Sequence, residues 1–117
     1  MSLELRLGIL RQSGMLSDSN YHKIQQVISY FKEKQNIDLN EENAATFITH
    51  LCSSLERISK GEKINEIDKD VYSSVKEEST FDQAVLISKD LQAMLPEIPD
   101  SELKFIIMHI GVLLGRI

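Results

Sequence analysis

The sequence has one cysteine, two prolines, five glycines and no tryptophan among its 117 residues. Its lone cysteine, Cys52, has no partner for an intramolecular disulfide, and its apolar helical surroundings favour a buried thiol in a reducing compartment. We therefore expect a cytoplasmic protein whose fold depends on a packed core instead of cross-links.

The sequence also lacks a basic block, a long hydrophobic run and a secretory leader. Its thirteen Lys and Arg residues are scattered among eighteen acidic residues, for a net charge of -5, so direct binding to a nucleic-acid backbone is not expected. The longest apolar stretch, 105–117, is too short to span a bilayer and contains His109 and Arg116. The first six residues do not combine a basic region with an apolar core. These absences leave one soluble domain, outside the membrane, as the expectation.

Known metal and catalytic motifs are also missing. No His-x-x-x-His or Cys-x-x-Cys spacing occurs, and the three histidines are far apart in the sequence. His22 lies in a polar helix start, where a solvated histidine is ordinary. There is neither a nucleophile elbow nor a glycine-rich phosphate loop. We therefore expect no enzymatic activity, no metal ion and no cofactor.

The sequence does contain helical periodicity along most of its length, without the alternation typical of strands. This pattern predicts an all-α fold, a compact bundle of about five helices. The weakest pattern lies over 65–78, where Ile67, Val71 and Val75 share one face. The other expected helical segments are 3–11, 19 to about 35, 41 to about 60, 80–94 and 102–117.

Helix ends are predicted from capping residues. Gly14 is suited to close the first segment, and Asn40 to cap the helix that begins at Glu41. The pair Lys60-Gly61 is expected to end that helix. The residues 100–102, Asp-Ser-Glu, are expected to cap the last helix and to supply a first-turn carboxylate.

His50 and His109 are the candidates for chemistry, because an imidazole titrates near neutral pH and can carry a phosphoryl group. His50 lies at the flank of an apolar helical stripe, one turn from Ser53 and Ser54 and two turns from Arg57. His109 lies in a last helix that is apolar nearly all round. Both positions also fit a structural histidine, at a core boundary or hydrogen-bonded inside the core, so periodicity alone leaves both interpretations open.

The sequences around His50 and His109 resemble motifs of the PTS regulation domain, the PRD, of bacterial transcriptional antiterminators and activators. The resemblance covers about 19–117, which makes 1–18 an N-terminal short helical extension and 19–117 the PRD-like domain. The residues that resemble the first motif are His50, Leu51, Leu55, Glu56-Arg57 and Lys60-Gly61. The residues that resemble the second motif are Pro99, Asp100, Glu102, Phe105, Met108 and His109-Ile110.

The resemblance implies a helical bundle, commonly a homodimer, whose histidines are phosphorylated by the sugar phosphotransferase system. The donor would be the phosphocarrier HPr or a sugar permease component, and the acceptors would be His50 and His109. Arg57 would support the phosphate site at the first histidine. In the family, phosphorylation shifts the dimer between arrangements and thereby switches an attached RNA- or DNA-binding module.

The sequence departs from the family pattern in several places. Thr49 stands where the family often has an acidic residue before the first histidine, so this position supplies no carboxylate to orient the ring. Lys104 and Ile107 stand where the second motif commonly has smaller residues, and these larger side chains would alter access to His109. The family usually has two such domains behind a nucleic-acid-binding module, whereas only one is recognised here, without such a module.

We therefore predict a stand-alone, dimeric PRD that senses phosphotransferase status and acts on a partner protein, for example a full-length transcription regulator. One alternative is a PRD-like interaction or dimerisation module that is not phosphorylated. A second alternative is a small phosphohistidine carrier that passes the phosphoryl group onward.

Overall fold

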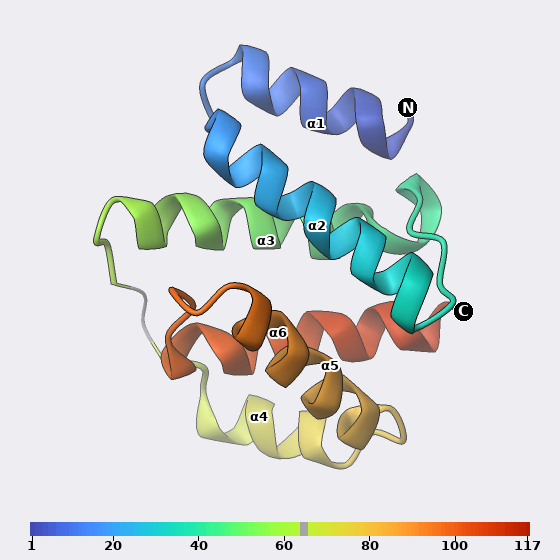
Figure 1. The fold of residues 1–117 in the computed structure, drawn as a ribbon. Helices are drawn as coiled ribbons and strands as arrows, with labels where there is room; N and C mark the ends of the chain where they lie inside the picture. Colours follow the sequence, from blue (N-terminus) through green and yellow to red (C-terminus); the bar gives the residue numbers. More distant parts are fainter. Residues whose placement is uncertain (64–65) are drawn as a thin grey trace. The chain divides into compact units, whose positions relative to one another are not determined.

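Six α-helices and no strand occur in residues 1–63 and 66–117, the part of the chain that the computed structural model describes (Figure 1). The all-α prediction is confirmed, with six helices in place of about five. The chain divides into two compact units, unit 1 (Met1–Gly61) and unit 2 (Glu62–Ile117). The helices are α1 (Leu3–Gln12), α2 (Asp18–Lys34), α3 (Glu41–Ser59), α4 (Lys69–Lys76), α5 (Phe81–Met94) and α6 (Asp100–Gly115).

In unit 1, helices α2 and α3 pack together and α1 contacts both of them. The apolar stripe predicted for α3 is confirmed, because Ile48, Leu51 and Leu55 are all buried. Helix α1 contributes Leu3 and Leu7, which are also buried, and burying one leucine side chain stabilises a fold by roughly 1.5–3 kcal/mol. The segment expected to be an extension therefore contributes to the core of unit 1.

The predicted helix ends of unit 1 form as expected. Gly14 has a φ of 79° and follows the C-cap of α1, a backbone conformation that costs glycine little. Asn40 caps α3, and its side chain and that of Asn43 each accept a hydrogen bond from the other's backbone N–H, at 2.9 and 3.0 Å. Gly61, with a φ of 70°, follows the end of α3.

In unit 2, helices α5 and α6 form the main packed pair, and the shorter α4 contacts α6. The core is built from the buried apolar side chains of the pair, which are Ala84, Ile87, Leu91, Ile106, Ile107, Ile110 and Leu113. Helix α4 has no buried residue. Its Tyr72 instead makes an edge-to-face contact with Phe81, with ring centroids 6.1 Å apart.

The starts of α4 and α6 differ in how far they follow the pattern of the sequence. Helix α4 begins at Lys69, and residue 65, where its pattern was expected to start, lies outside the described residues. The predicted cap of α6 is wrong, because the N-cap position is Pro99 and no side chain caps it. Asp100 lies inside the first turn, where its carboxylate accepts a hydrogen bond from Gln92 at 2.9 Å.

Candidate functional site

The middle of α3 presents His50 to solvent, because the helix turns its apolar stripe inward and leaves this position exposed. The residues one turn away on either side are Thr46, Phe47, Ser53 and Ser54, so no carboxylate lies next to the ring on this helix. The predicted position at the flank of the stripe is confirmed, but His50 is exposed where a partly buried ring was expected. An exposed imidazole with hydroxyl-bearing residues one turn away can accept a phosphoryl group without repulsion from an acid one turn away on α3.

Arg57 lies two helical turns after His50 on the same face of α3, about 10 Å farther along the axis. Its guanidinium donates a hydrogen bond to the hydroxyl of Ser54 at 3.1 Å. Ser54 is one turn from His50, so the arginine side chain runs back along the helix toward the histidine. The structure thus brings His50, Ser54 and Arg57 onto one ridge, which we call the α3 ridge.

The residue before the histidine, Thr49, faces helix α1. The guanidinium of Arg6 donates to the Thr49 hydroxyl at 3.4 Å and forms a paired contact with the carboxylate of Glu41, through Nε at 3.0 and 3.1 Å and through Nη2. The hydrogen bond from Arg6 lowers the pKa of Glu41. At the position before the histidine, this chain therefore has a hydroxyl that accepts a hydrogen bond from a cation of α1.

Glu56, the acidic residue of the Glu-Arg pair in the first motif, ties α3 to the start of α2. The same carboxylate oxygen accepts two hydrogen bonds, one from the side-chain amide of Asn20 and one from the backbone N–H of Ser17 at 3.1 Å. Burial raises the pKa of Glu56, but the bonds from Asn20 and Ser17 outweigh it, and the net pKa is lowered. Asn20 is buried and also donates to Ser59 at 3.1 Å. This arrangement gives Glu56 a structural role.

His109 lies on α6 in unit 2 and is half-buried. Its neighbours one turn away on the inner side, Ile106 and Leu113, are buried, whereas Val112 is half exposed on the other side. His109 therefore lies at the boundary of the core, with buried residues on one side and an exposed residue on the other. This position is compatible with both a structural and a functional histidine. His109 and the α3 ridge belong to different units.

The remaining candidate residues have ordinary surroundings. Cys52 is buried, and burial followed by the nearby Glu56 charge raises the pKa of its thiol to about 12, so the predicted structural thiol is confirmed. His22 is exposed and makes an edge-to-face contact with Tyr21, with ring centroids 5.6 Å apart.

Neither a metal-binding group nor a membrane-spanning helix occurs in the part of the chain that the structure describes. Within residues 1–63 and 66–117, no three His, Cys, Asp or Glu side chains come together in a group that could hold a metal ion. No helix of this same part of the chain combines the length and apolar character needed to cross a bilayer.

Sequence reasoning missed two features of the site, the Arg6 contact to Thr49 and the Asn20–Glu56 link. Arg6 lies in the segment that was set apart as an extension, although the spacing of Leu3 and Leu7 there already indicated a packed helix. The link from Asn20 to Glu56 joins residues 36 positions apart. No local pattern predicts such a pairing.

The sequence was compared with solved structures, known proteins and family models. No solved structure matches the chain. A relative, the uncharacterized protein YhfY of Escherichia coli strain K12, is 22% identical over 89 residues, which cover 76% of this chain and 74% of the relative. The family model of the PRD domain matches residues 25–113, a range that contains both His50 and His109. Because this match covers most of the sequence, the chain belongs to the PRD domain family.

Proposed function

We propose that this chain is a regulatory domain of sugar-phosphotransferase-linked transcription control, which accepts a phosphoryl group on histidine and acts through a partner protein. The observation that carries the proposal is the α3 ridge. There, an exposed His50 has hydroxyl groups one turn away and Arg57 two turns away. PRD domains are regulatory, and the proposed chemistry requires only an accessible acceptor, since a separate protein supplies the phosphoryl group.

The proposed transfer moves one phosphoryl group between two imidazoles. A ring nitrogen of neutral His50 uses its lone pair to form a bond to phosphorus while the bond between phosphorus and the donor's histidine nitrogen breaks. The other ring nitrogen of His50 gives up its proton to solvent, and the donor ring takes up one proton and leaves as a neutral imidazole. The new group carries about two negative charges, by analogy with other phosphorylated side chains. Hydroxyl donors at Thr46 and Ser53 and the cation of Arg57 suit that charge.

We propose His109 as a second acceptor, with a different consequence. Because its ring lies at the edge of the α6 core, beside Ile106 and Leu113, a phosphoryl group there would need water around its charge. Phosphorylation of His109 would therefore loosen the packing of α6, whereas phosphorylation of His50 would change surface charge. Two acceptors of this kind would give one chain two separable responses.

The proposed partners follow from the family. The donor is HPr or a sugar permease component, and the downstream partner is a full-length transcription regulator in the cytoplasm. We also propose that the chain forms a homodimer. Sedimentation at micromolar concentration tests this assembly, and a monomer throughout that range would overturn it.

A protein-interaction module that is not phosphorylated is the alternative, and helix α1 provides an observation in its favour. The outward face of α1 carries Leu5 and Ile9, which are 54% and 46% exposed. No charged residue lies between them on that face, because Glu4, Arg6 and Arg11 fall to either side. Two exposed apolar side chains one turn apart suit a contact with a protein partner.

The proposal is tested by phosphate transfer from phosphoenolpyruvate through Enzyme I and HPr, with and without a sugar permease component, followed by intact-mass spectrometry. We expect wild type to gain one or two phosphoryl groups and His50→Ala to lose the faster one. His22→Ala is the matched control, since it removes an exposed histidine of the same unit, and it should be labelled like wild type. Arg57→Gln should accept the group more slowly than wild type.

Three outcomes decide between the hypotheses. If wild type stays unlabelled while a known acceptor is labelled in the same tube, the chain is an interaction module and not a phosphorylated regulatory domain. If the phosphoryl group is transferred rapidly from the chain to a permease component, the chain is a phosphohistidine carrier. If His22→Ala loses the label and His50→Ala keeps it, the assignment to the α3 ridge is wrong.

A further inference from the structure

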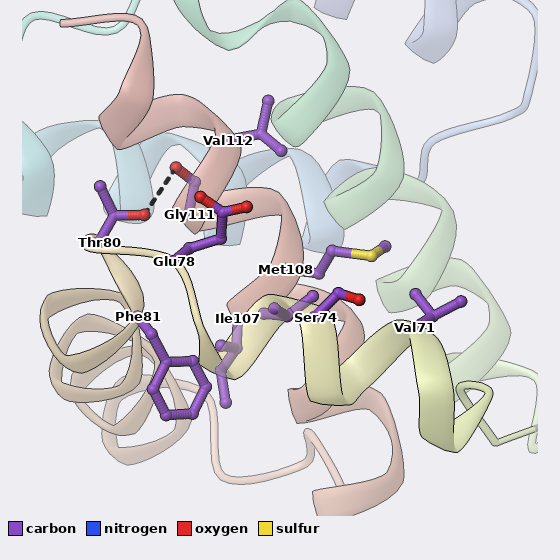
Figure 2. A pocket seen from close by; sticks show the side chains of 10 residues that line it. Val71, Ser74, Glu78, Thr80, Phe81, Ile107, Met108, Gly111 and Val112 are labelled. Atoms are coloured by element: carbon purple, nitrogen blue, oxygen red, sulfur yellow. Dashed lines mark hydrogen bonds between the residues drawn. The ribbon is translucent and has the colours of Figure 1, made fainter.

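Unit 2 contains a pocket of about 430 Å³ between α4, the turn before α5, and α6 (Figure 2). This volume is within the range of about 300–1,000 Å³ that is typical of small-molecule sites. Its walls are mainly apolar, and the side chains that form them are Val71, Val75, Phe81, Ile107, Met108 and Val112. The proposed phosphoryl transfer does not use this pocket.

The polar groups at the pocket all offer hydrogen-bond acceptors. The Thr80 hydroxyl donates its hydrogen to the carbonyl of Gly111 at 3.2 Å, and the Ser74 hydroxyl donates to the carbonyl of Asp70 at 3.2 Å. Each hydroxyl has then used its one donor and keeps oxygen lone pairs. The third group is the carboxylate of Glu78, which accepts hydrogen bonds and carries a negative charge. A ligand that satisfies this set must be a donor.

Charge and shape together define the ligand class. None of the residues that line the pocket is a lysine or an arginine, so the Glu78 carboxylate is the charged group that a ligand meets there. Figure 2 shows this side chain beside Gly111 and Thr80, with the ring of Phe81 farther along the wall. We propose that the pocket binds a compact apolar amine in its protonated form, with the ammonium group toward Glu78 and Thr80 and the hydrocarbon toward Val71 and Val112.

Helix α4 is suited to accommodate such a ligand. It has no buried residue, and its Val71 is 47% exposed although it faces the pocket. The wall opposite, Val112 on α6, is 50% exposed. A hydrocarbon group between these two valines would remove apolar surface from water, which is favourable in proportion to the area covered. Since α6 also carries His109, an occupied pocket would give unit 2 an input separate from phosphorylation.

The test uses isopentylamine as the probe, with isopentanol as its uncharged counterpart of similar shape. Binding to the full, unphosphorylated chain is followed by NMR of its methyl groups at low ionic strength. We expect the amine to shift the methyl signals of Val71, Val75 and Val112, and to bind about fivefold more tightly than the alcohol, as suits an ion pair near the surface. Added salt should reduce this difference.

Glu78→Gln should reduce the affinity for the amine to that for the alcohol. Glu77→Gln is the matched control, because it removes the neighbouring exposed carboxylate, which does not line the pocket, and it should leave the affinity unchanged. Equal affinities for the two probes, or an unchanged affinity in Glu78→Gln, would overturn the proposal. The absence of shifts at these methyl groups up to millimolar amine would overturn it too. Neither result depends on whether the chain is phosphorylated.

Discussion

Replacing Glu56 by alanine removes the acceptor that links α3 to the start of α2. The buried amide of Asn20, which is 1% exposed, then loses a hydrogen bond to a charged oxygen. Leaving a buried donor unsatisfied costs about 1–3 kcal/mol. The N–H of Ser17 lies at an exposed position, so water can replace its bond at little cost. We therefore expect Glu56→Ala to lower the free energy of unfolding of unit 1 by about 2 kcal/mol.

Glu56→Gln separates the hydrogen bond from the charge. Both donors approach the same carboxylate oxygen, so the amide oxygen of glutamine can still accept from Asn20, and the loss should stay below about 1 kcal/mol. The lowered pKa of Glu56 in the folded chain means that its charge contributes stability above the pKa of the unfolded chain. That contribution is lost as pH falls through the folded pKa. Acid should therefore destabilise wild type more than Glu56→Gln.

The assay is urea unfolding, followed through the amide NMR signals of Ile48 and Leu51, which report on unit 1 without averaging over unit 2. Glu33→Ala, at an exposed position on α2, serves as the control and should change stability by less than about 0.5 kcal/mol. A double-mutant cycle with Asn20→Ala should give a coupling of about 1–2 kcal/mol. Equal stabilities of Glu56→Ala and Glu33→Ala, or a coupling near zero, would refute this account of the link.

Three further predictions concern stability and reactivity. Gly14→Ala should destabilise unit 1 by about 1 kcal/mol because of its φ of 79°. Gly8→Ala, inside α1 with open space around the added Cβ, should instead stabilise it by about 0.5–1 kcal/mol. Changes of the same sign in the free energy of unfolding of both variants, measured by thermal unfolding, would contradict this. Arg6→Ala should raise the pKa of Glu41 toward its ordinary value in an NMR titration, since the hydrogen bond from Arg6 lowers it, and an unchanged pKa would contradict the paired contact. Cys52 should react with a thiol reagent at neutral pH only when unit 1 unfolds, because burial raises its pKa to about 12, and reaction at the rate of a free thiol would argue against its burial.

Local patterns were sufficient to predict the helices of unit 1. Helical spacing of apolar residues placed the buried stripe of α3, and Asn40 and Gly14 marked ends that the structure confirms. These features depend on interactions within a few residues, which sequence patterns record directly.

Contacts between helices were beyond such patterns. Asp100 looked like a cap but accepts a hydrogen bond from Gln92 on the preceding helix, and Thr80 bonds to the carbonyl of Gly111 instead of capping α5. Glu56 similarly has its partner in Asn20 on another helix. A short polar side chain fits a cap and a tertiary hydrogen bond equally well, so its role depends on packing that its own segment does not encode.

The candidate site was predicted in part. The exposure of His50 and its position two turns before Arg57 follow from helical spacing, whereas the contact of Arg6 with Thr49 required the placement of α1. The phosphorylation of His50 and His109 stays a prediction, because exposure permits the chemistry without demonstrating it.

The most direct test of the central claim is a time course of phosphorylation of the wild-type chain by HPr, with the occupancy of each histidine read by fragmentation mass spectrometry under alkaline conditions. The α3 ridge predicts that His50 gains the phosphoryl group first, that His109 follows more slowly, and that His22 stays unmodified. A chain that remains unmodified at His50, with HPr alone and with a sugar permease component added, while a control acceptor is phosphorylated, would contradict the account.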